Sequence, residues 1–89
     1  MKLFTLNTKF AFGKYKGKTL SEVSNTDLSY ISWCLLNLES FIIDPEVYEE
    51  LKCNFSNFVF TENVELIQTK KLKIYWVNQL INNALKAFI

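Results

Sequence analysis

The feature that most constrains the fold is the position of the residues that break regular structure. The 89 residues include only two glycines, Gly13 and Gly17, and one proline, Pro45. Glycine permits sharp turns, and proline is tolerated at the first position of a helix but not in its interior. We therefore expect turns or strands around the glycines, a helix that begins at Pro45, and a long uninterrupted helix near the C-terminus.

The N-terminal region has the alternating pattern of a half-buried strand. Phe10 and Phe12 are separated by one residue, and the two glycines then bracket the short segment Lys-Tyr-Lys. This order predicts a strand, a tight turn or bulge, and a return strand over residues 18–20. Residues 3–6 are a candidate third strand.

Two helices are predicted in the middle of the chain. Asn25 or Thr26 can cap the first, and Asp27 suits the positive end of its dipole. Asp44 before Pro45 is the clearest cap in the sequence and starts the second. The apolar face of the first helix comprises Leu28, Ile31, Leu35 and Leu38, and is widened by Tyr30, Trp33 and Cys34.

The expected architecture is one α+β domain spanning residues 1–89. A small N-terminal β-hairpin of two or three strands occupies residues 1–23 and packs on about three α-helices. Two helices lie within residues 26–54, and the third spans residues 62–88. The segment CNFSNFVF, residues 53–60, fits either a loop with phenylalanine anchors or a short strand.

The glycine segment resembles a phosphate-binding P-loop only superficially. A P-loop has four residues between its glycines, whereas three separate Gly13 from Gly17. A P-loop also follows a buried strand and opens a helix, which the alternating pattern here does not predict. Residues 41–44 are an apolar run that ends in an aspartate, as do strands that bind magnesium in nucleotide hydrolases, but Asp44 is better explained as a helix cap. Nucleotide hydrolysis is not expected.

The residue types argue against an enzyme. The chain has no histidine, and its two cysteines cannot supply the four ligands of a structural zinc site. Cys34 and Cys53 are interpreted as buried free thiols, because nothing suggests an oxidising compartment. We expect no catalytic residue, no metal and no cofactor.

Charge is segregated along the chain although the formal net charge is +1. All nine acidic residues lie within residues 19–65, together with one lysine, Lys52. In the segments on either side, every charged side chain is a lysine. Lysine does not make the bidentate contacts by which arginine reads guanine, so weak sequence preference is expected of any nucleic-acid contact. AT-biased coding would deplete arginine in the same way.

The clearest basic cluster lies in the predicted hairpin. Lys14, Lys16 and Lys18 occupy every second position, and alternate side chains of an extended strand share one face. With Lys9 nearby, such a ribbon suits a sugar-phosphate backbone. Alternatively, the lysines only keep a sheet edge soluble and unpaired. The residues alone leave both interpretations open.

The first half of the chain resembles the small C-terminal domain of exodeoxyribonuclease X-like proteins. That family joins Phe-Gly-Lys-x-Lys-Gly-Lys to a leucine, a Glu-Val pair, an aspartate and a Tyr-(Ile/Leu)-x-Trp helix. The resemblance covers about residues 10–51 and leaves out the last helix. The matching residues are Phe12, Gly13, Lys14, Lys16, Gly17, Lys18, Leu20, Glu22, Val23, Asp27, Tyr30, Ile31 and Trp33, and Asn37 and Phe41 fit a common continuation.

The resemblance implies a bacterial or phage accessory module that binds nucleic acid. We favour DNA over RNA as its partner, although the sequence leaves both open. It implies no exonuclease activity, because the nuclease domain of the longer relatives has no counterpart here. Glu22 and Asp27 are expected to anchor the hairpin by capping a helix or pairing a lysine, and Tyr30 and Trp33 are interpreted as core. The implied site consists of Lys9, Lys14, Lys16 and Lys18 for phosphates, Tyr15 for base stacking, and Gly13 and Gly17 for the hairpin turn.

The last helix suggests a competing function. Its apolar face is far broader than the stripe of about 100° that a surface helix needs. Either the helix is buried from two sides within one chain, or it contacts a second copy or another protein. The alternative function is therefore protein–protein interaction or oligomerisation. The apolar residues are Leu72, Ile74, Tyr75, Trp76, Val77, Leu80, Ile81, Ala84, Leu85 and Phe88.

Nothing in the sequence indicates export or a membrane partner. The apolar run after Lys2 is interrupted almost at once, and no stretch approaches the ~20 apolar residues that span a bilayer. We expect a cytoplasmic protein.

Overall fold

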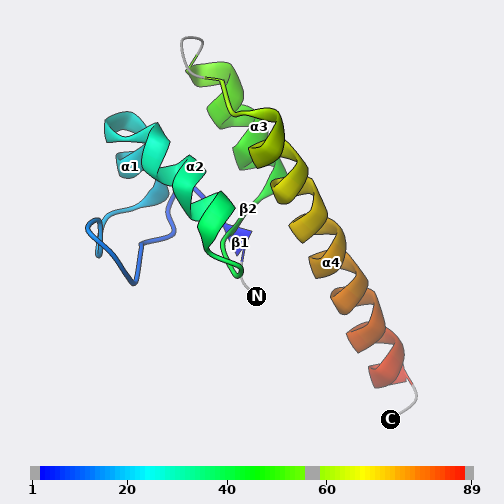
Figure 1. Cartoon of the computed structure of the whole chain (residues 1–89). Coiled ribbons are helices and arrows are strands. Elements are labelled where there is room, and N and C mark those ends of the chain that lie inside the picture. Colours follow the sequence, from blue (N-terminus) through cyan, green and yellow to red (C-terminus); the bar gives the residue numbers. More distant parts are fainter. Residues whose placement is uncertain (1–2, 56–58, 88–89) are drawn as a thin grey trace.

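The computed structural model describes residues 3–55 and 59–87, in which four helices accompany a two-stranded sheet (Figure 1). The α+β fold is confirmed, with one helix more than expected. Residues 56–58 of the ambiguous segment, and Phe88 as the predicted end of the last helix, lie outside the described residues. In chain order the elements are β1 (Leu3–Phe4), α1 (Leu20–Thr26), α2 (Leu28–Asn37), β2 (Ile42–Ile43), α3 (Pro45–Asn54) and α4 (Glu62–Ala87).

The sheet joins two segments that are far apart in the sequence. β1 pairs in parallel with β2, and Leu3 lies opposite Ile42 and Phe4 opposite Ile43. The candidate third strand of the hairpin therefore exists over two residues but pairs with the chain that follows α2. The alternating pattern detected a strand, but such a pattern carries no information about which distant segment will pair with it.

Residues 9–18, which we call the lysine loop, do not form the two strands of the predicted β-hairpin. One isolated antiparallel bridge joins Lys9 to Thr19, and the Phe10 N–H donates to the Lys18 carbonyl at 2.9 Å. Between these contacts the chain runs through consecutive bends and turns, with both glycines at positive φ, 72° and 87°. Because Lys14 and Lys16 lie in turns, the alternation of lysines in the sequence does not align them along a strand.

α1 is an element that the sequence interpretation missed. Its N-terminus is a capping box, in which the Glu22 N–H donates to Thr19 Oγ1 at 3.1 Å and the Thr19 N–H donates to Glu22 Oε1 at 3.2 Å. The sequence carries the signal, because a Thr-x-x-Glu motif stands before the apolar Leu20 and Val23. Both of these side chains are buried.

α2 and α3 are each capped by an aspartate. Asp27 caps α2 by accepting from the Tyr30 N–H at 3.1 Å, whereas the predicted caps Asn25 and Thr26 lie in the last turn of α1. Asp44 caps α3 as predicted, accepting from two backbone amides of its first turn, with proline at the first helical position.

The apolar core lies where the lysine loop, the helices and β2 meet. Phe10 is buried, and its ring centroid lies 5.2 Å from that of Phe4 and 5.9 Å from that of Phe41. Cys34 is buried as expected and burial raises its pKa to about 11, but Cys53 is exposed on α3. The other buried apolar side chains are Leu20, Val23, Ile31, Leu35, Ile42, Ile43, Tyr48, Leu51, Phe60, Val64 and Leu72.

The first half of α4 is fastened to the sheet by a buried glutamine. Gln68 Oε1 accepts from the Ile43 N–H at 3.1 Å, and Gln68 Nε2 donates to the Ile43 carbonyl at 2.5 Å. The side chain thereby satisfies backbone groups that a two-residue strand would otherwise leave unpaired on one side.

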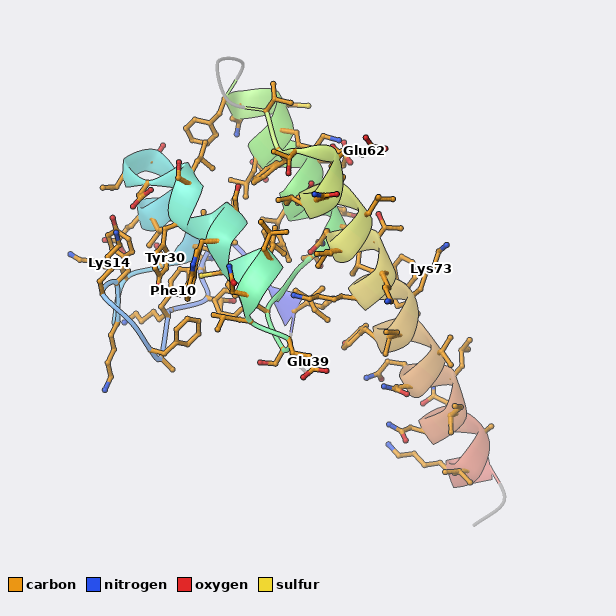
Figure 2. The ribbon with its side chains drawn as sticks, in the orientation of Figure 1. Phe10, Lys14, Tyr30, Glu39, Glu62 and Lys73 are labelled. Atoms are coloured by element: carbon orange, nitrogen blue, oxygen red, sulfur yellow. The ribbon has the colours of Figure 1, made fainter. Side chains whose placement is uncertain are left out.

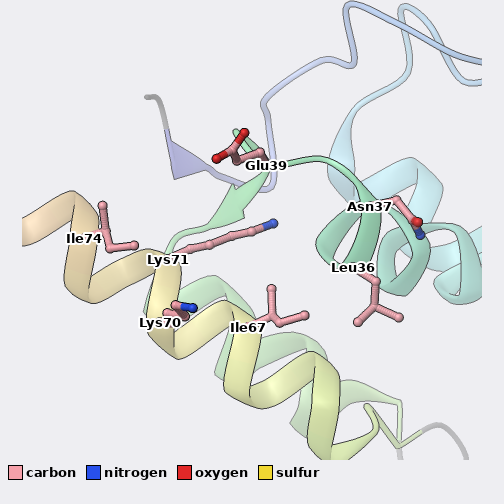
Figure 3. A pocket seen from close by; sticks show the side chains of 7 residues that line it. All are labelled: Leu36, Asn37, Glu39, Ile67, Lys70, Lys71 and Ile74. Atoms are coloured by element: carbon pink, nitrogen blue, oxygen red, sulfur yellow. The ribbon is translucent and has the colours of Figure 1, made fainter.

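Lys71 fastens α4 to the end of α2 (Figure 3). Its Nζ donates to the carbonyls of Leu35 and Leu38 at 2.7 Å each and to that of Phe41 at 3.1 Å. Carbonyls at the C-terminal end of a helix lack intrahelical partners and carry partial negative charge, so an ammonium group suits them.

The second half of α4 projects beyond the rest of the molecule (Figure 1). From Lys73 to Lys86 every side chain except that of Tyr75 is exposed. The described residues therefore do not bury this half of the helix from two sides, which was one of the two alternatives left open by the sequence. Its apolar residues are open to solvent.

Candidate nucleic-acid interface

Aromatic rings attach the lysine loop to α2. The Tyr30 ring lies 5.9 Å from that of Phe10 and 4.9 Å from that of Tyr15, with interplanar angles of 63° and 77°. Both are edge-to-face contacts, a preferred geometry for aromatic pairs. Figure 2 shows Phe10, Lys14 and Tyr30 gathered where the loop meets α1 and α2, across the molecule from Lys73.

Asp27 links the loop to α2 through three polar contacts. Tyr15 Oη donates to Asp27 Oδ2 at 2.9 Å, and Lys14 Nζ lies 3.3 Å from the same oxygen. The third contact is the helix cap with Tyr30. The hydrogen bond from Tyr15 is the main cause that lowers the pKa of Asp27, and hydrogen bonding to Asp27 raises the pKa of both Tyr15 and Lys14. The expected anchoring role of Asp27 is confirmed.

Glu22 anchors the other end of the loop. Besides its place in the capping box, its Oε2 lies 3.9 Å from Lys18 Nζ. The hydrogen bond from the Thr19 N–H is the main cause that lowers the pKa of Glu22. The carboxylate therefore stays ionised at neutral pH and offsets one lysine, as expected from the sequence.

The four loop lysines are not equivalent. Lys14 and Lys18 pair with the two anchoring carboxylates, yet each side chain remains 62% exposed. In the described part of the chain, Lys9 and Lys16 form no ion pair, and both are exposed. Four lysines and two carboxylates leave this region with a formal charge of +2.

Gly13 stands where the loop touches α2. Its φ is 72°, and a Cβ at this position would collide with the Tyr30 hydroxyl. Gly17 has a φ of 87°, but a Cβ there would meet no atom within 4 Å. Both glycines shape the loop, and Gly13 also permits its close approach to Tyr30.

Tyr15, the expected stacking residue, is half-buried. Its hydroxyl is bound to Asp27, and its ring contacts Tyr30 in an edge-to-face arrangement. The arrangement gives Tyr15 a part in holding the loop on α2. Stacking of a base on its ring stays a prediction.

Trp33 is on the surface, which corrects its interpretation as a core residue. Its side chain is 50% exposed, and its ring stacks on half-buried Tyr30 with centroids 6.0 Å apart and planes 20° apart. At about 100° per residue, Trp33 lies about 200° around the helix from buried Ile31, so the wheel already placed it opposite the core. Beside it is a depression of about 520 Å³ lined by Gly13, Lys14, Asp27, Ser29, Tyr30 and Trp33.

Comparison with known families identifies the segment that builds this surface. The sequence profile of the family described as Exodeoxyribonuclease X-like C-terminal matches residues 10–39. The resemblance to exodeoxyribonuclease X-like C-terminal domains is confirmed for this segment. The matched segment contains every residue that lines the depression beside Trp33, whereas Lys9 precedes it and α4 lies outside it.

Two curated relatives of the exodeoxyribonuclease X-like domain are named Exodeoxyribonuclease 10, one from Escherichia coli strain K12 and one from Escherichia coli O6:H1 strain CFT073. This chain is 42% identical to each over 53 residues, which are 60% of this chain and 23% of the relative. The chain thus matches about a quarter of the length of these relatives. No solved structure matches it.

Another hollow is lined partly by the end of the exodeoxyribonuclease X-like segment and partly by α4. It has a volume of about 450 Å³ and lies between the end of α2 and α4 (Figure 3), where the Lys71 ammonium group is already held by carbonyls. In residues 3–55 and 59–87, no group of three or more histidine, cysteine, aspartate or glutamate side chains is placed to hold a metal ion. None of the described helices is long and apolar enough to cross a membrane.

Proposed function

We propose that the domain binds nucleic acid through the lysine loop, weakly and with little sequence preference, and has no catalytic role. The observation that carries the proposal is the charge of +2 that remains after the anchoring carboxylates have offset two of the four lysines. Exposed ammonium groups contact phosphates without reading base sequence. Affinity should lie in the non-specific range, about 10⁻⁴ to 10⁻⁶ M at physiological salt.

The preferred nucleic acid in this proposal is DNA. The curated relatives are named exodeoxyribonucleases, and the match covers only 23% of their length. A segment of this size that lacks histidine suits an accessory role, in which it holds DNA for an enzyme that performs the chemistry.

A fluorescence-anisotropy titration with labelled DNA and RNA, repeated from low to physiological salt, tests the proposal. For duplex DNA, two to four lysine–phosphate contacts predict a slope of log K against log salt of about −2 to −4. The double variant Lys9→Gln/Lys16→Gln should reduce the slope by about two units, one for each lysine. Neither lysine forms an ion pair in the described residues, so the fold should not change.

The matched control is Lys73→Gln/Lys86→Gln. It removes the same charge from α4, and Figure 2 shows Lys73 across the molecule from the loop. This control should change the slope by less than about one unit. Equal losses in both double variants, or no binding by the wild type at low salt, would contradict the proposal.

A second candidate function is self-association through the free half of α4. Val64, Gln68 and Leu72 are buried against the body, and at 100° per residue Gln79 and Asn82 continue in that direction. Most of the apolar side chains lie on the far side, and Trp76 and Leu85 lie at its two edges. Covering them with the same face of a second copy would bury on the order of 1,000 Å² in total, at the lower end of stable interfaces. These exposed side chains are Trp76, Val77, Leu80, Ile81 and Leu85.

Sedimentation over a series of protein concentrations tests this second candidate. A dimer through this face predicts a mass that rises with protein concentration. Leu80→Glu should return the mass to that of one chain, and Asn82→Glu should not. A constant mass of one chain would reject it. The lysine-loop variants should leave this mass unchanged, which separates the two functions.

A further inference from the structure

We propose that Trp33 is a stacking surface for an unpaired nucleobase, so that the domain prefers single-stranded to duplex nucleic acid. The proposal rests on the proposed function, because the lysine loop must supply the phosphate contacts. The comparisons assign no role to this side chain.

Three aromatic rings lead from the core to the surface, and the outermost is half exposed. Phe10 is buried and lies 5.9 Å from Tyr30, which in turn lies 6.0 Å from Trp33 with the two planes 20° apart. Trp33 is 50% exposed although its ring packs on that of Tyr30, so half of the side chain remains accessible to a ligand. Stacked aromatic pairs have centroids about 4.5–7 Å apart, and a base can extend this series outward.

The depression beside Trp33 combines aromatic and polar walls. Its volume is about 520 Å³, and Lys14, Ser29, Tyr30 and Trp33 are among the residues that line it. Asp27 also lines it, but Lys14 Nζ at 3.3 Å balances that carboxylate and limits its repulsion of a phosphate. A nucleotide therefore meets aromatic side chains beside a balanced lysine–aspartate pair, and its phosphates are contacted by Lys9 and Lys16 of the loop.

Stacking on a side chain requires a base with a free face. In a duplex both faces of a base are covered by its neighbours, whereas a single strand can turn a base onto an aromatic ring. Every base has such a face, so stacking adds affinity without sequence preference. This agrees with a loop whose basic residues are all lysine. A role for Trp33 in contacting another protein would instead show no dependence on strandedness.

The variant Trp33→Leu tests the proposal, because it removes the aromatic face and keeps an apolar side chain. Affinity for oligothymidylate of about ten nucleotides should fall about 5- to 100-fold, while affinity for a duplex with equal phosphate number should change at most about two-fold. The salt slope should not change, since no charge is removed. Trp33→Phe retains a ring and should recover most of the loss. Leu36→Ala, an exposed side chain on the next turn of α2, is the control and should leave both affinities unchanged.

Fluorescence provides a direct readout of stacking. The chain has two tryptophans, so the variant Trp76→Phe leaves Trp33 as the only one. Oligothymidylate should quench its emission in proportion to binding, and the duplex should not. Bound oligothymidylate without quenching would contradict stacking even if the leucine variant failed to fold.

The outcomes separate the two proposals. If Trp33→Leu binds oligothymidylate as well as the wild type, while Lys9→Gln/Lys16→Gln does not, stacking is wrong and the proposed function stands. If Trp33→Leu lost the same affinity for single-stranded and duplex DNA, stacking would also be wrong. Such a result would mean that Trp33 does not contact an unpaired base. If the wild type binds no nucleic acid at low salt, the proposed function fails and stacking fails with it.

Discussion

At the scale of single residues, the lysine loop shows how a segment without strands is held in one shape. Asp27 caps α2, accepts the Tyr15 hydroxyl and pairs with Lys14, so one carboxylate closes the loop onto the helix. The sequence predicted the turn-forming glycines and the Asp27 anchor, because these residue types favour turns and helix caps. The prediction that Trp33 is a core residue was wrong, because its position on the helical wheel is opposite buried Ile31.

Substitution of the two glycines separates backbone strain from close approach. Gly13→Ala should destabilise the domain by about 1–2 kcal/mol because its φ is 72°, and by more because a Cβ collides with the Tyr30 hydroxyl. Gly17→Ala should incur only the first cost, since its Cβ would meet no atom within 4 Å. Urea unfolding of the wild type and both variants measures the difference. Equal destabilisation by the two substitutions would show that contact with Tyr30 does not constrain the loop.

At the scale of elements, sequence motifs predict where a helix begins, because a helix start depends on neighbouring residues. The Asp-Pro start of α3 was predicted from sequence, and the Thr-x-x-Glu motif would have given α1. The parallel pairing of β1 with β2 was not predictable in this way, because it depends on the burial of Ile42 and Ile43 far along the chain. The predicted hairpin is reduced to the single bridge between Lys9 and Thr19, because the residues between them run through bends and turns.

The attachment of α4 to α2 is testable through Lys71. Lys71→Met keeps the length of the side chain but removes the donor to three backbone carbonyls. Leaving buried acceptors unpaired should lower the free energy of unfolding by about 1–3 kcal/mol in urea titrations. Lys70→Met, on the exposed side of the same helix, should change it by about 0.5 kcal/mol at most. A loss of similar size in both variants would contradict a specific role for Lys71.

At the scale of the whole molecule, two exposed surfaces of different chemistry lie apart. The lysine loop and Trp33 form a basic and aromatic surface within the exodeoxyribonuclease X-like segment, and the free half of α4 forms an apolar surface outside it. Charge segregation in the sequence predicted the basic part of the first surface, whereas the breadth of the apolar face left burial within the chain and contact with a partner both open. Only the structure shows that α4 leaves its apolar face uncovered by the chain itself, because this depends on where the body of the domain ends.

The measurement that tests the central claim most directly is nuclear magnetic resonance of nitrogen-15-labelled protein titrated with single-stranded DNA of about ten nucleotides at low salt. The account predicts that the backbone amides of residues 9–18 and the Trp33 indole N–H shift together as DNA is added, while the amides of residues 76–86 do not move. Shifts confined to α4, or no shifts at any DNA concentration, would contradict the claim that the lysine loop is a nucleic-acid-binding surface.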